Sequence, residues 1–244
     1  MRYSVQVQYV GKNYAGSQYQ PDVPTIQNEL EKAIRTLINE NKRFKTVFSG
    51  RTDAGVNSAG QVVHFDLDKN IVASNFVYSL NEILPDDISV SDLKEVSPEF
   101  HAQKSAKSRR YRYELINRKH KNAFDGDLLR VKYDVNLERM QESLNYLLGE
   151  HDFSSFKSSG TLNPSKVCFI ENAVIQKDGD KIIVEITGNR FLYNMVRTIV
   201  GTLLEIEGRN LPAEHMKNVL EAKDRRKAGK TVSPYGLALV EVKY

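Results

Sequence analysis

One short stretch of the chain combines residue types that can do chemistry with glycines that expose them. It reads Ser49-Gly50-Arg51-Thr52-Asp53-Ala54-Gly55-Val56. The flanking glycines predict a tight, exposed turn, because glycine adopts backbone conformations that other residues avoid. An aspartate in such a turn can cap the turn, accept a salt bridge or act in catalysis, and capping is the commonest of the three. The local residues leave these alternatives open.

Several familiar kinds of site do not fit the sequence. The stretch lacks the spacing of a phosphate-binding Walker loop and contains no serine nucleophile elbow. The single cysteine, Cys168, excludes an intrachain disulfide and a zinc site of the CxxC type. The five histidines show no ligand spacing, so we expect them to be structural and expect no metal site.

Positive charge gathers in the second part of the chain. The net charge is +4, but acids outnumber bases before residue 104 and bases outnumber acids after it. The segment Lys104–Lys121 holds eight basic residues and one acid, and residues 225–230 form a second basic cluster. Such clusters suit the phosphate backbone of a nucleic acid, although a solvated lysine-rich surface has the same composition.

The composition is that of a globular protein. Of the 244 residues, 40% are hydrophobic and 27% are charged, which is enough to form one large domain or two small ones. No apolar run approaches the roughly 18 residues that a membrane span needs, and the first residues do not resemble a signal peptide. With one cysteine, a reducing, cytoplasmic setting without a membrane is the simplest expectation.

The first half alternates strands with helices. A period of two residues predicts strands over 3–9, 45–49, 61–68 and 88–96. A period of 3.6 predicts helices over about 25–40, with Thr25 as N-cap, and over about 73–84. The interval from Gly50 to Gly60 is expected to be a glycine-rich loop.

The second half repeats this plan loosely. Strands are predicted over 108–116, 167–176, 181–187 and 237–244, the middle two forming a hairpin. Helices are predicted after Asn136, from about Phe191 to Gly208, and from Pro212. The pattern indicates an α+β protein with two similar halves, 1–103 and 104–244, each an antiparallel-rich sheet backed by helices.

Ordered motifs along the chain resemble one known family. Gly50-Arg51-Thr52-Asp53-Ala54-Gly55-Val56, followed by Gly60-Gln61-Val62-Val63-His64-Phe65, is similar to the signature of the tRNA pseudouridine synthase A family. Further blocks resemble the same family in the same order, up to the last strand. They are Phe100-His101-Ala102 with Arg109-Arg110-Tyr111-Arg112-Tyr113, Asp152-Phe153-Ser154-Ser155-Phe156, Phe191-Leu192-Tyr193-Asn194-Met195-Val196-Arg197, and Gly236-Leu237-Ala238-Leu239.

The resemblance implies a catalytic role for three residues. Asp53 is expected to be the catalytic carboxylate, Tyr111 the active-site tyrosine, and Arg197 the arginine that pairs with the aspartate. From pattern alone, an aromatic residue on an alternating strand face, such as Tyr111, is usually part of the core. Arg197 fits equally an arginine at the edge of an apolar helix, with its charged end in solvent.

The resemblance also implies a substrate and an assembly. The expected reaction converts uridine to pseudouridine at positions 38 to 40 of the tRNA anticodon stem-loop, in a central RNA-binding cleft of the pseudouridine synthase fold. It is redox-neutral and needs no cofactor, and the family implies a homodimer. Arg51 is expected to assist base flipping and phosphate contact. Further substrate contacts are expected from Tyr111, Lys104, Lys107, Arg109, Arg110 and the cluster at 225–230.

Three positions depart from the family pattern. The chain has Val10 where the family favours aspartate, Ser17 where it favours tryptophan, and Asn57 where it usually has histidine. These departures motivate an alternative function, a non-catalytic tRNA-binding or tRNA-folding module of the same fold. A third reading is an unrelated small-molecule enzyme that holds phosphate in the loop from Gly50 to Gly60, which salt-sensitive binding of tRNA but not of free nucleotides would exclude.

Overall fold

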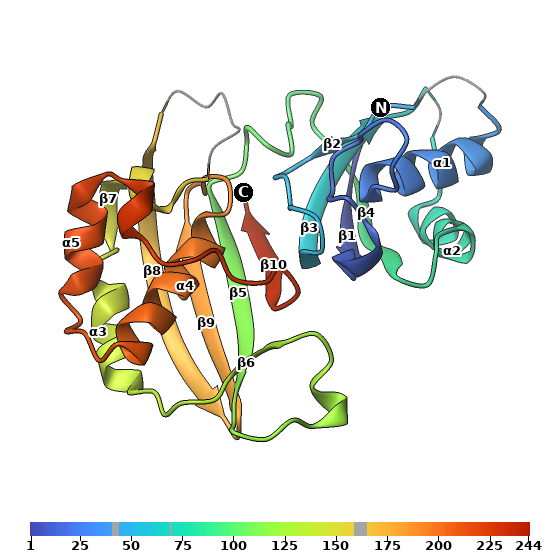
Figure 1. Cartoon of the computed structure of the whole chain (residues 1–244). Coiled ribbons are helices and arrows are strands. Elements are labelled where there is room, and N and C mark those ends of the chain that lie inside the picture. Colours follow the sequence, from blue (N-terminus) through green and yellow to red (C-terminus); the bar gives the residue numbers. More distant parts are fainter. Residues whose placement is uncertain (41–43, 69, 159–164) are drawn as a thin grey trace. The chain divides into compact units, whose positions relative to one another are not determined.

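The chain folds as two compact units. The computed structural model describes residues 1–40, 44–68, 70–158 and 165–244 (Figure 1). One unit comprises Met1–Lys107 with Ala238–Tyr244, and the other comprises Ser108–Leu237. Each contains an antiparallel-rich sheet backed by helices, so the predicted α+β class is confirmed.

The sheet of the first unit is completed by the end of the chain. Its strand order is β4-β1-β3-β10, and β2 pairs with the C-terminal part of β3. All neighbours run antiparallel except β10, which lies parallel to β3. The elements are β1 (Arg2–Tyr9), α1 (Ile26–Ile38), β2 (Val47–Phe48), β3 (Asn57–Asp66), α2 (Ala73–Ile83), β4 (Ile88–Val96) and β10 (Leu237–Lys243), with the short 3₁₀ helix η1 (Gly11–Asn13).

The alternation of β1 builds the core of this unit. Val5 and Val7 are buried and belong to one apolar cluster with Leu30 of α1 and Leu80 of α2. The predicted cap of α1 is confirmed, because the side chain of Thr25 accepts a hydrogen bond from the Asn28 amide at 3.2 Å. Burial of a side chain of this size stabilises the fold by about 1.5–3 kcal/mol relative to exposure, so the helices are fixed on the sheet by packing.

The second unit has the strand order β5-β9-β8-β7, with β6 parallel to β5. In Figure 1, α4 lies across the sheet and α3 and α5 lie beside β8 and β7. The elements are β5 (Ser108–Asn117), β6 (Leu129–Val131), α3 (Leu137–Asn145), β7 (Gly149–Asp152), β8 (Val167–Asp178), β9 (Lys181–Gly188), α4 (Met195–Gly208) and α5 (His215–Ala222), with the 3₁₀ helices η2 (Ala123–Asp125), η3 (Ser154–Phe156) and η4 (Arg225–Lys227).

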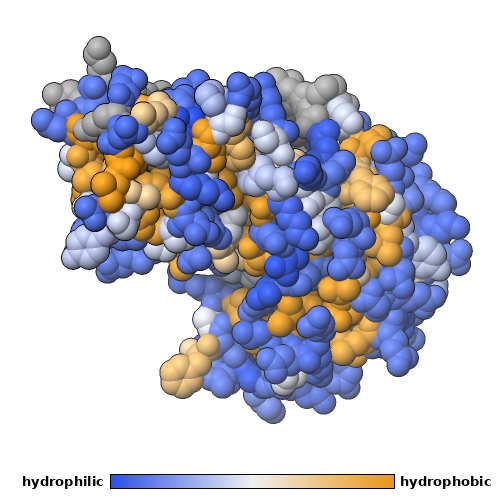
Figure 2. Space-filling model, turned by 180° about the vertical axis from the view of Figure 1, so that it is seen from behind, coloured by the Kyte–Doolittle hydropathy of each residue, from blue (hydrophilic) through white to orange (hydrophobic). Residues whose placement is uncertain are grey.

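The two faces of the second sheet differ in chemistry. Alternate residues of β5 and β9, among them Tyr113 and Val184, are fully buried. The residues between them form ion pairs instead, with Glu185 2.8 Å from Arg112 and 3.3 Å from Arg110. Seen from behind, the molecule shows a largely hydrophilic surface with hydrophobic patches between the polar side chains (Figure 2). The alternation therefore sets one face for packing and the other for charge.

Some predicted boundaries were wrong. The predicted loop from Gly50 to Gly60 ends early, because β3 begins at Asn57 and pairs there with Ala238 of β10. A Cβ on Gly60 would lie 2.4 Å from the carbonyl oxygen of Val240, so glycine here permits close strand pairing and does not form a loop. The short strands β6 and β7 were not predicted.

Two helix starts were also placed too early. The helix expected from Phe191 begins at Met195, after Asn194 in a left-handed conformation with φ 61°. The helix expected from Pro212 begins at His215, whose amide donates to the carbonyl oxygen of Pro212 at 3.0 Å. In both places an irregular turn precedes the regular helix, and a periodic apolar pattern does not distinguish the two.

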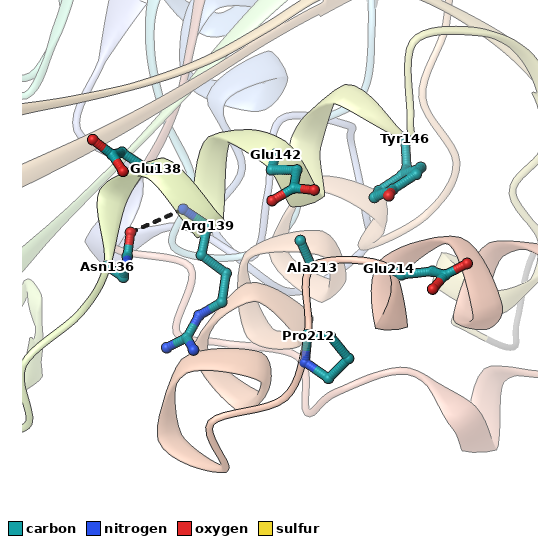
Figure 3. A pocket seen from close by; sticks show the side chains of 8 residues that line it. All are labelled: Asn136, Glu138, Arg139, Glu142, Tyr146, Pro212, Ala213 and Glu214. Atoms are coloured by element: carbon teal, nitrogen blue, oxygen red, sulfur yellow. Dashed lines mark hydrogen bonds between the residues drawn. The ribbon is translucent and has the colours of Figure 1, made fainter.

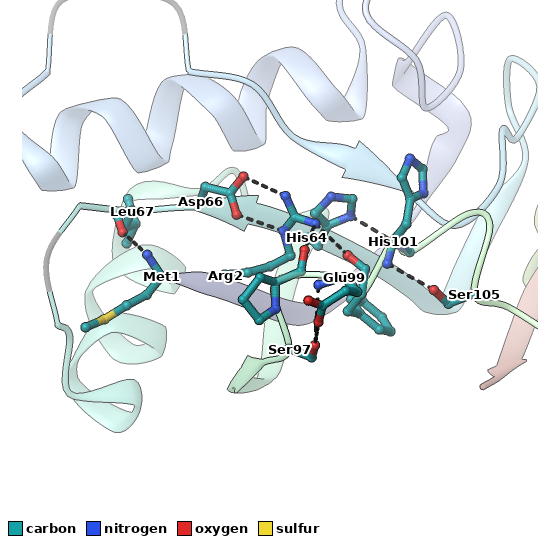
Figure 4. A network of polar contacts seen from close by, with 12 residues as sticks. Met1, Arg2, His64, Asp66, Leu67, Ser97, Glu99, His101 and Ser105 are labelled. Atoms are coloured by element: carbon teal, nitrogen blue, oxygen red, sulfur yellow. Dashed lines mark hydrogen bonds and ion pairs between the residues drawn. The ribbon is translucent and has the colours of Figure 1, made fainter.

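The segment that follows β4 is fastened to the first unit by residues from both ends of the chain. Arg2 donates to the carbonyl oxygens of Pro98 and Phe100 at 2.5 and 2.9 Å, and its guanidinium also pairs with Asp66 (Figure 4). The hydroxyl of Tyr244 donates to the carbonyl oxygen of Ala102 at 2.8 Å. These bonds hold the segment over residues 97–107, which consists of turns and has no helix or strand of its own.

His64 contributes a bond that depends on its protonation state. The ring is 4% exposed, and its Nδ1 accepts a hydrogen bond from the Ala102 amide at 3.1 Å. Burial first, and then the charges of Arg2 and His101, lower the pKa of His64 to about 4, while Asp66 acts in the opposite direction. As the pH falls below about 6.5, an exposed histidine begins to take up a proton. His64 in the folded protein stays neutral until the pH approaches 4.

This arrangement predicts a loss of stability in mild acid. Because the folded-state pKa of His64 lies below the unfolded value of about 6.5, its contribution is complete above pH 6.5 and is lost as the pH falls towards 4. We expect up to about 3 kcal/mol of the free energy of unfolding to be lost over this range. In His64→Asn, whose amide oxygen accepts but does not titrate, we expect this part of the pH dependence to disappear. Urea unfolding between pH 7 and 4 measures it.

The exposed His120 provides the matched control. His120→Asn should retain the pH dependence of the wild type. A pH dependence that is identical in wild type and His64→Asn would show that His64 is not the titrating group.

Candidate active site

The turn that carries Asp53 joins β2 to β3. The carbonyl oxygen of Asp53 accepts a hydrogen bond from the Val56 amide at 3.1 Å, and Gly55 has φ 78°, which glycine adopts without strain. Arg51 is exposed, Thr52 is buried and Asp53 is half-buried. The predicted tight turn is therefore present, and it combines an anchored residue with two charged residues that reach the surface.

Thr52 is the anchor of this turn. Its amide donates to the hydroxyl oxygen of Ser17 at 2.8 Å, and its carbonyl oxygen accepts from the Ser17 amide at 3.0 Å. Its own hydroxyl lies 2.8 Å from that of Tyr9. All three residues are buried, so every polar group of Thr52 is satisfied within the protein, and the backbone next to Asp53 is fixed.

A buried polar network supports the other side of the turn. Gln61 of β3 donates to the carbonyl oxygen of Gly50 at 2.9 Å and accepts from the hydroxyl of Ser49 at 2.5 Å. Its amide also reaches the hydroxyl of Tyr9 at 3.4 Å. Burial raises the pKa of Tyr9, so its hydroxyl stays protonated and keeps its place in the network. Buried networks in which each group is satisfied make a local structure rigid.

The three departures from the family pattern have different structural consequences. Ser17 supplies the acceptor for Thr52, a bond that a tryptophan side chain cannot make because it has only a donor. Asn57 accepts a hydrogen bond from the Gly11 amide at 2.9 Å and so ties the neighbouring loop to β3. Val10 is 56% exposed and bonds through its backbone to Asp87. Ser17 thus holds the turn directly, and Asn57 holds the loop beside it.

Tyr111 lies in the second unit, on β5. Its side chain is 9% exposed, and its ring meets Phe191 edge-on, with the ring centres 5.0 Å apart and an interplanar angle of 76°. Its strand partner is Ile186 of β9. The ring is therefore held by aromatic packing on a rigid strand, which is the mounting that a base-stacking residue needs.

Arg197 lies in the first turn of α4 in the same unit. Its Nε donates to the carbonyl oxygen of Val232 at 2.8 Å, and its Nη1 donates to the side chain of Asn194 at 2.6 Å. These two acceptors fix the plane of the guanidinium. Burial raises the pKa of Tyr113, and the positive charge of Arg197 lowers it by a smaller amount. Arg197 is therefore a half-buried, oriented cation, rather than one that extends freely into solvent.

The predicted substrate contacts fall into two groups. Lys104 and Lys107 are exposed on the segment after β4, in the first unit with Arg51. Arg109 and Arg110 begin β5, where Arg109 donates to the carbonyl oxygen of Asn189 at 2.8 Å and Arg110 pairs with Glu185. In the basic cluster at 225–230, Arg225 binds Ala228 and Thr231, and Arg226 pairs with Asp224. Several of these cations therefore also have structural partners.

A shallow hollow of about 470 Å³ lies between α3 and the approach to α5 (Figure 3). Three glutamates line it, at positions 138, 142 and 214. Arg139 in this hollow is bound to the buried carboxylate of Glu207 at 2.6 Å. None of the residues predicted for the active site lines the hollow, and its carboxylates repel phosphate, so we do not take it as the substrate site.

Within the described ranges, no three His, Cys, Asp or Glu side chains are grouped so that they could hold a metal ion. The helices found in those ranges include none that is long and apolar enough to cross a membrane.

The sequence did not reveal the residues that support Asp53. Tyr9, Ser17 and Gln61 act through hydrogen bonds to the turn, and Ser17 was noted only as a departure from the family pattern. Gln61 is one of several polar residues of β3, so its residue type gives no distinct local signal. Its partners Tyr9, Ser49 and Gly50 are not adjacent in sequence, so the sequence alone does not reveal the network.

Comparison with known proteins identifies the class. The profile of the family described as tRNA pseudouridine synthase matches residues 5–103 and 144–244. The chain belongs to this family, which confirms the resemblance seen in the sequence. Among its relatives, tRNA pseudouridine synthase A of Thermoanaerobacter sp. (strain X514) is 41% identical over 243 residues, covering 98% of this chain and 97% of the relative. That of Bacillus licheniformis is 42% identical over 246 residues, covering 100% and 99%.

A more distant likeness is seen in a solved structure, "Crystal Structure of a Cbf5-Nop10-Gar1 Complex". The identity is 9%, the TM-score is 0.40, and the match covers 83% of this chain and 53% of the other. This chain therefore spans about half the length of that one, and a likeness at this level says nothing about its function.

The geometry of the turn predicts that Ser17→Ala destabilises the protein. The substitution leaves the buried Thr52 amide without its acceptor, which costs about 1–3 kcal/mol. Urea unfolding measures the change in the free energy of unfolding. Ser74→Ala, at an exposed position of α2, is the control and should change it by less than about 0.5 kcal/mol. Equal stability of Ser17→Ala and wild type would contradict the anchoring of the turn by this hydroxyl.

Proposed function

We propose that this isomerase of the tRNA pseudouridine synthase family converts uridine to pseudouridine in the anticodon stem-loop of tRNA, at positions 38 to 40, with Asp53 as its catalytic carboxylate. The observation that carries the proposal is the presentation of Asp53. It lies in the signature turn of the family, beside a residue whose backbone and side chain are bound by buried groups. A carboxylate on such a rigid mount is suited to chemistry on a bound nucleotide.

The proposed reaction rearranges bonds without net gain or loss of atoms. The bond between N1 of uracil and C1′ of the ribose breaks, the base turns, and a bond forms between C5 and C1′. The proton on C5 is released, and N1 acquires one. The carboxylate of Asp53 can serve either as a nucleophile or as the negative charge that stabilises a positive sugar. Both roles require the carboxylate to be ionised and correctly placed.

Tyr111 and Arg197 are the proposed partners of Asp53. The ring of Tyr111 would stack on the extruded base, and its hydroxyl would assist removal of the C5 proton. The guanidinium of Arg197 would hold the carboxylate ionised and oriented. The support comes from the family motifs and from the mounting of the two side chains, by Phe191 for Tyr111 and by Val232 and Asn194 for Arg197.

The remaining parts of the proposal concern binding and assembly. Arg51 would assist base flipping, and Lys104, Lys107, Arg109 and Arg110 would contact phosphates, because flipping a stacked nucleotide costs a few kcal/mol that backbone contacts offset. We further propose a homodimer that works in the cytoplasm without a cofactor. These expectations follow from family membership and from the basic second part of the sequence.

A non-catalytic tRNA-binding module is the second candidate. The substitutions at Val10, Ser17 and Asn57 favour it, because they alter the surroundings of the signature turn. Against it stands the role of Ser17, which holds the turn through Thr52, next to Asp53. Asn57 holds the neighbouring loop to β3 through Gly11. The isomerase is therefore the better supported function.

The decisive measurement is release of tritium from tRNA labelled at C5 of uridine. We expect release by the wild type and a rate lower on the order of 10⁴-fold or more for Asp53→Asn, which keeps the shape of the side chain but not its charge. tRNA binding by the variant should persist. The control is Asp92→Asn, at an exposed position with φ 50° that asparagine also tolerates, and it should retain full activity.

Other outcomes would change the assignment. Wild-type binding of tRNA without tritium release from any tRNA would favour the non-catalytic module. Release by Asp53→Asn at the wild-type rate would remove Asp53 from the chemistry. Sequencing of the modified tRNA would show whether the products lie at positions 38 to 40.

A further inference from the structure

The loop between β5 and β6 displays an aromatic ring to solvent. This loop, residues 118–128, leaves the end of the second unit's sheet in Figure 1 and contains the 3₁₀ helix η2. Phe124 in η2 is 96% exposed, more than any other large hydrophobic side chain in the ranges that the structure describes. Single exposed hydrophobic residues are common on protein surfaces and need no special explanation. The way in which this residue is mounted sets it apart.

Charged side chains hold the base of the loop. The guanidinium of Arg118 binds both carboxylate oxygens of Asp125, at 2.5 and 2.6 Å, and also reaches Asp180 on the neighbouring hairpin at 2.7 Å. This guanidinium holds the pKa of the Asp125 carboxyl below its usual range, so the pair stays ionised at neutral pH. Both bonds to Asp125 come from Nη2, and Nη1 binds Asp180, so the guanidinium ties the loop to the hairpin.

A capping box fixes the backbone on both sides of Phe124. The side chain of Asn122 accepts from the Phe124 amide at 3.0 Å, and the side chain of Asp125 accepts from the Asn122 amide at 3.2 Å. The conformation of the loop is thus maintained by polar contacts that do not include the ring. The backbone around Phe124 is ordered before any partner binds, so binding to the ring would cost little backbone entropy.

The surroundings of the ring indicate the chemistry of that partner. Lys119, His120 and Lys121 precede it and are exposed. Arg118 pairs with both Asp125 and Asp180, and the exposed Asp127 follows the ring. A protein interface normally buries an apolar centre of several residues, and the residues adjoining Phe124 in the loop are mostly polar or charged. One aromatic face among cations is instead the combination that binds a nucleobase and its phosphates.

We propose that Phe124 stacks on an unpaired base of the tRNA substrate, with Lys119 and Lys121 contacting the adjacent phosphates. The proposal rests on the proposed function in taking tRNA as the ligand, and it adds a second point of contact. Along β5, Tyr111 and Arg118 are separated by roughly 20 Å at about 3.3 Å per residue. The base on Phe124 is therefore a different nucleotide from the one proposed to stack on Tyr111, and this contact contributes to binding but not to the chemical step.

Substitutions distinguish the contribution of base stacking to tRNA binding from the contribution of charge. We expect Phe124→Ala to weaken tRNA binding about 5- to 100-fold, the range of a lost aromatic–base stack, and to raise KM with kcat unchanged. Its dependence on salt should match the wild type, whereas Lys121→Ala should reduce the slope of log K against log salt by about one. Tyr78→Ala removes an aromatic side chain that is 68% exposed on α2 and should leave binding unchanged.

A direct optical test is available because the chain contains no tryptophan. Phe124→Trp introduces a single tryptophan that can still stack, so it should bind tRNA with an affinity close to the wild type. Its fluorescence should be quenched when tRNA is added, while the matched variant Tyr78→Trp should not respond.

Three results would overturn the proposal. The first is wild-type affinity of Phe124→Ala, and the second is an unquenched tryptophan in Phe124→Trp at saturating tRNA. The third is a fall in molecular mass of Phe124→Ala by sedimentation, which would make the loop a contact between copies of the chain. Failure of the proposed function is distinguishable, since a wild type that binds tRNA without releasing tritium leaves the binding and quenching results intact.

Discussion

The candidate active site depends on the exchange of hydrogen bonds between Ser17 and Thr52. The turn that carries Asp53 has no regular secondary structure, so its backbone groups need partners from elsewhere. The amide and carbonyl of Thr52 find them in the hydroxyl and amide of Ser17, and its hydroxyl finds Tyr9. Because these groups are buried, loss of any one leaves a desolvated partner. The turn is held tightly although its charged residues reach the surface.

Completion of the first unit by the end of the chain is the second constraint. β10 lies parallel to β3, and Gly60 has no side chain to obstruct the approach of Val240. At the other end of this strand, Tyr244 binds the segment after β4, which Arg2 holds from the start of the chain. The unit therefore combines residues that lie far apart in the sequence.

The residues to which we assign roles are held in position by different kinds of contact. Asp53 is supported by a buried polar network and Tyr111 by aromatic packing, both close to the sheets. Phe124 is supported by ion pairs and a capping box on a surface loop. The contacts that hold the loop of Phe124 do not include its ring, so substituting Phe124 need not disturb the loop. The ring of Tyr111 is itself part of the packing that holds it. Binding at Phe124 can therefore be tested apart from folding.

The sequence by itself determined the local elements and the family. The strand at Ile88–Val96 follows from alternation, and the caps Thr25 and Asn136 follow from side chains that each accept from the amide three residues further on. The signature around Asp53 identified the family because its residues are contiguous. Only the tertiary structure revealed that residues 57–60 form a strand, that Ser17 holds Thr52, and that Arg110 pairs with Glu185. Each of these depends on a partner far along the chain. For the strand at residues 57–60, the hydroxyl of Ser58 donates a hydrogen bond to the carbonyl oxygen of Leu239, which lies 181 residues away. Local patterns carry the period of an element, and the choice of a distant partner is made by packing and by the need to satisfy buried polar groups.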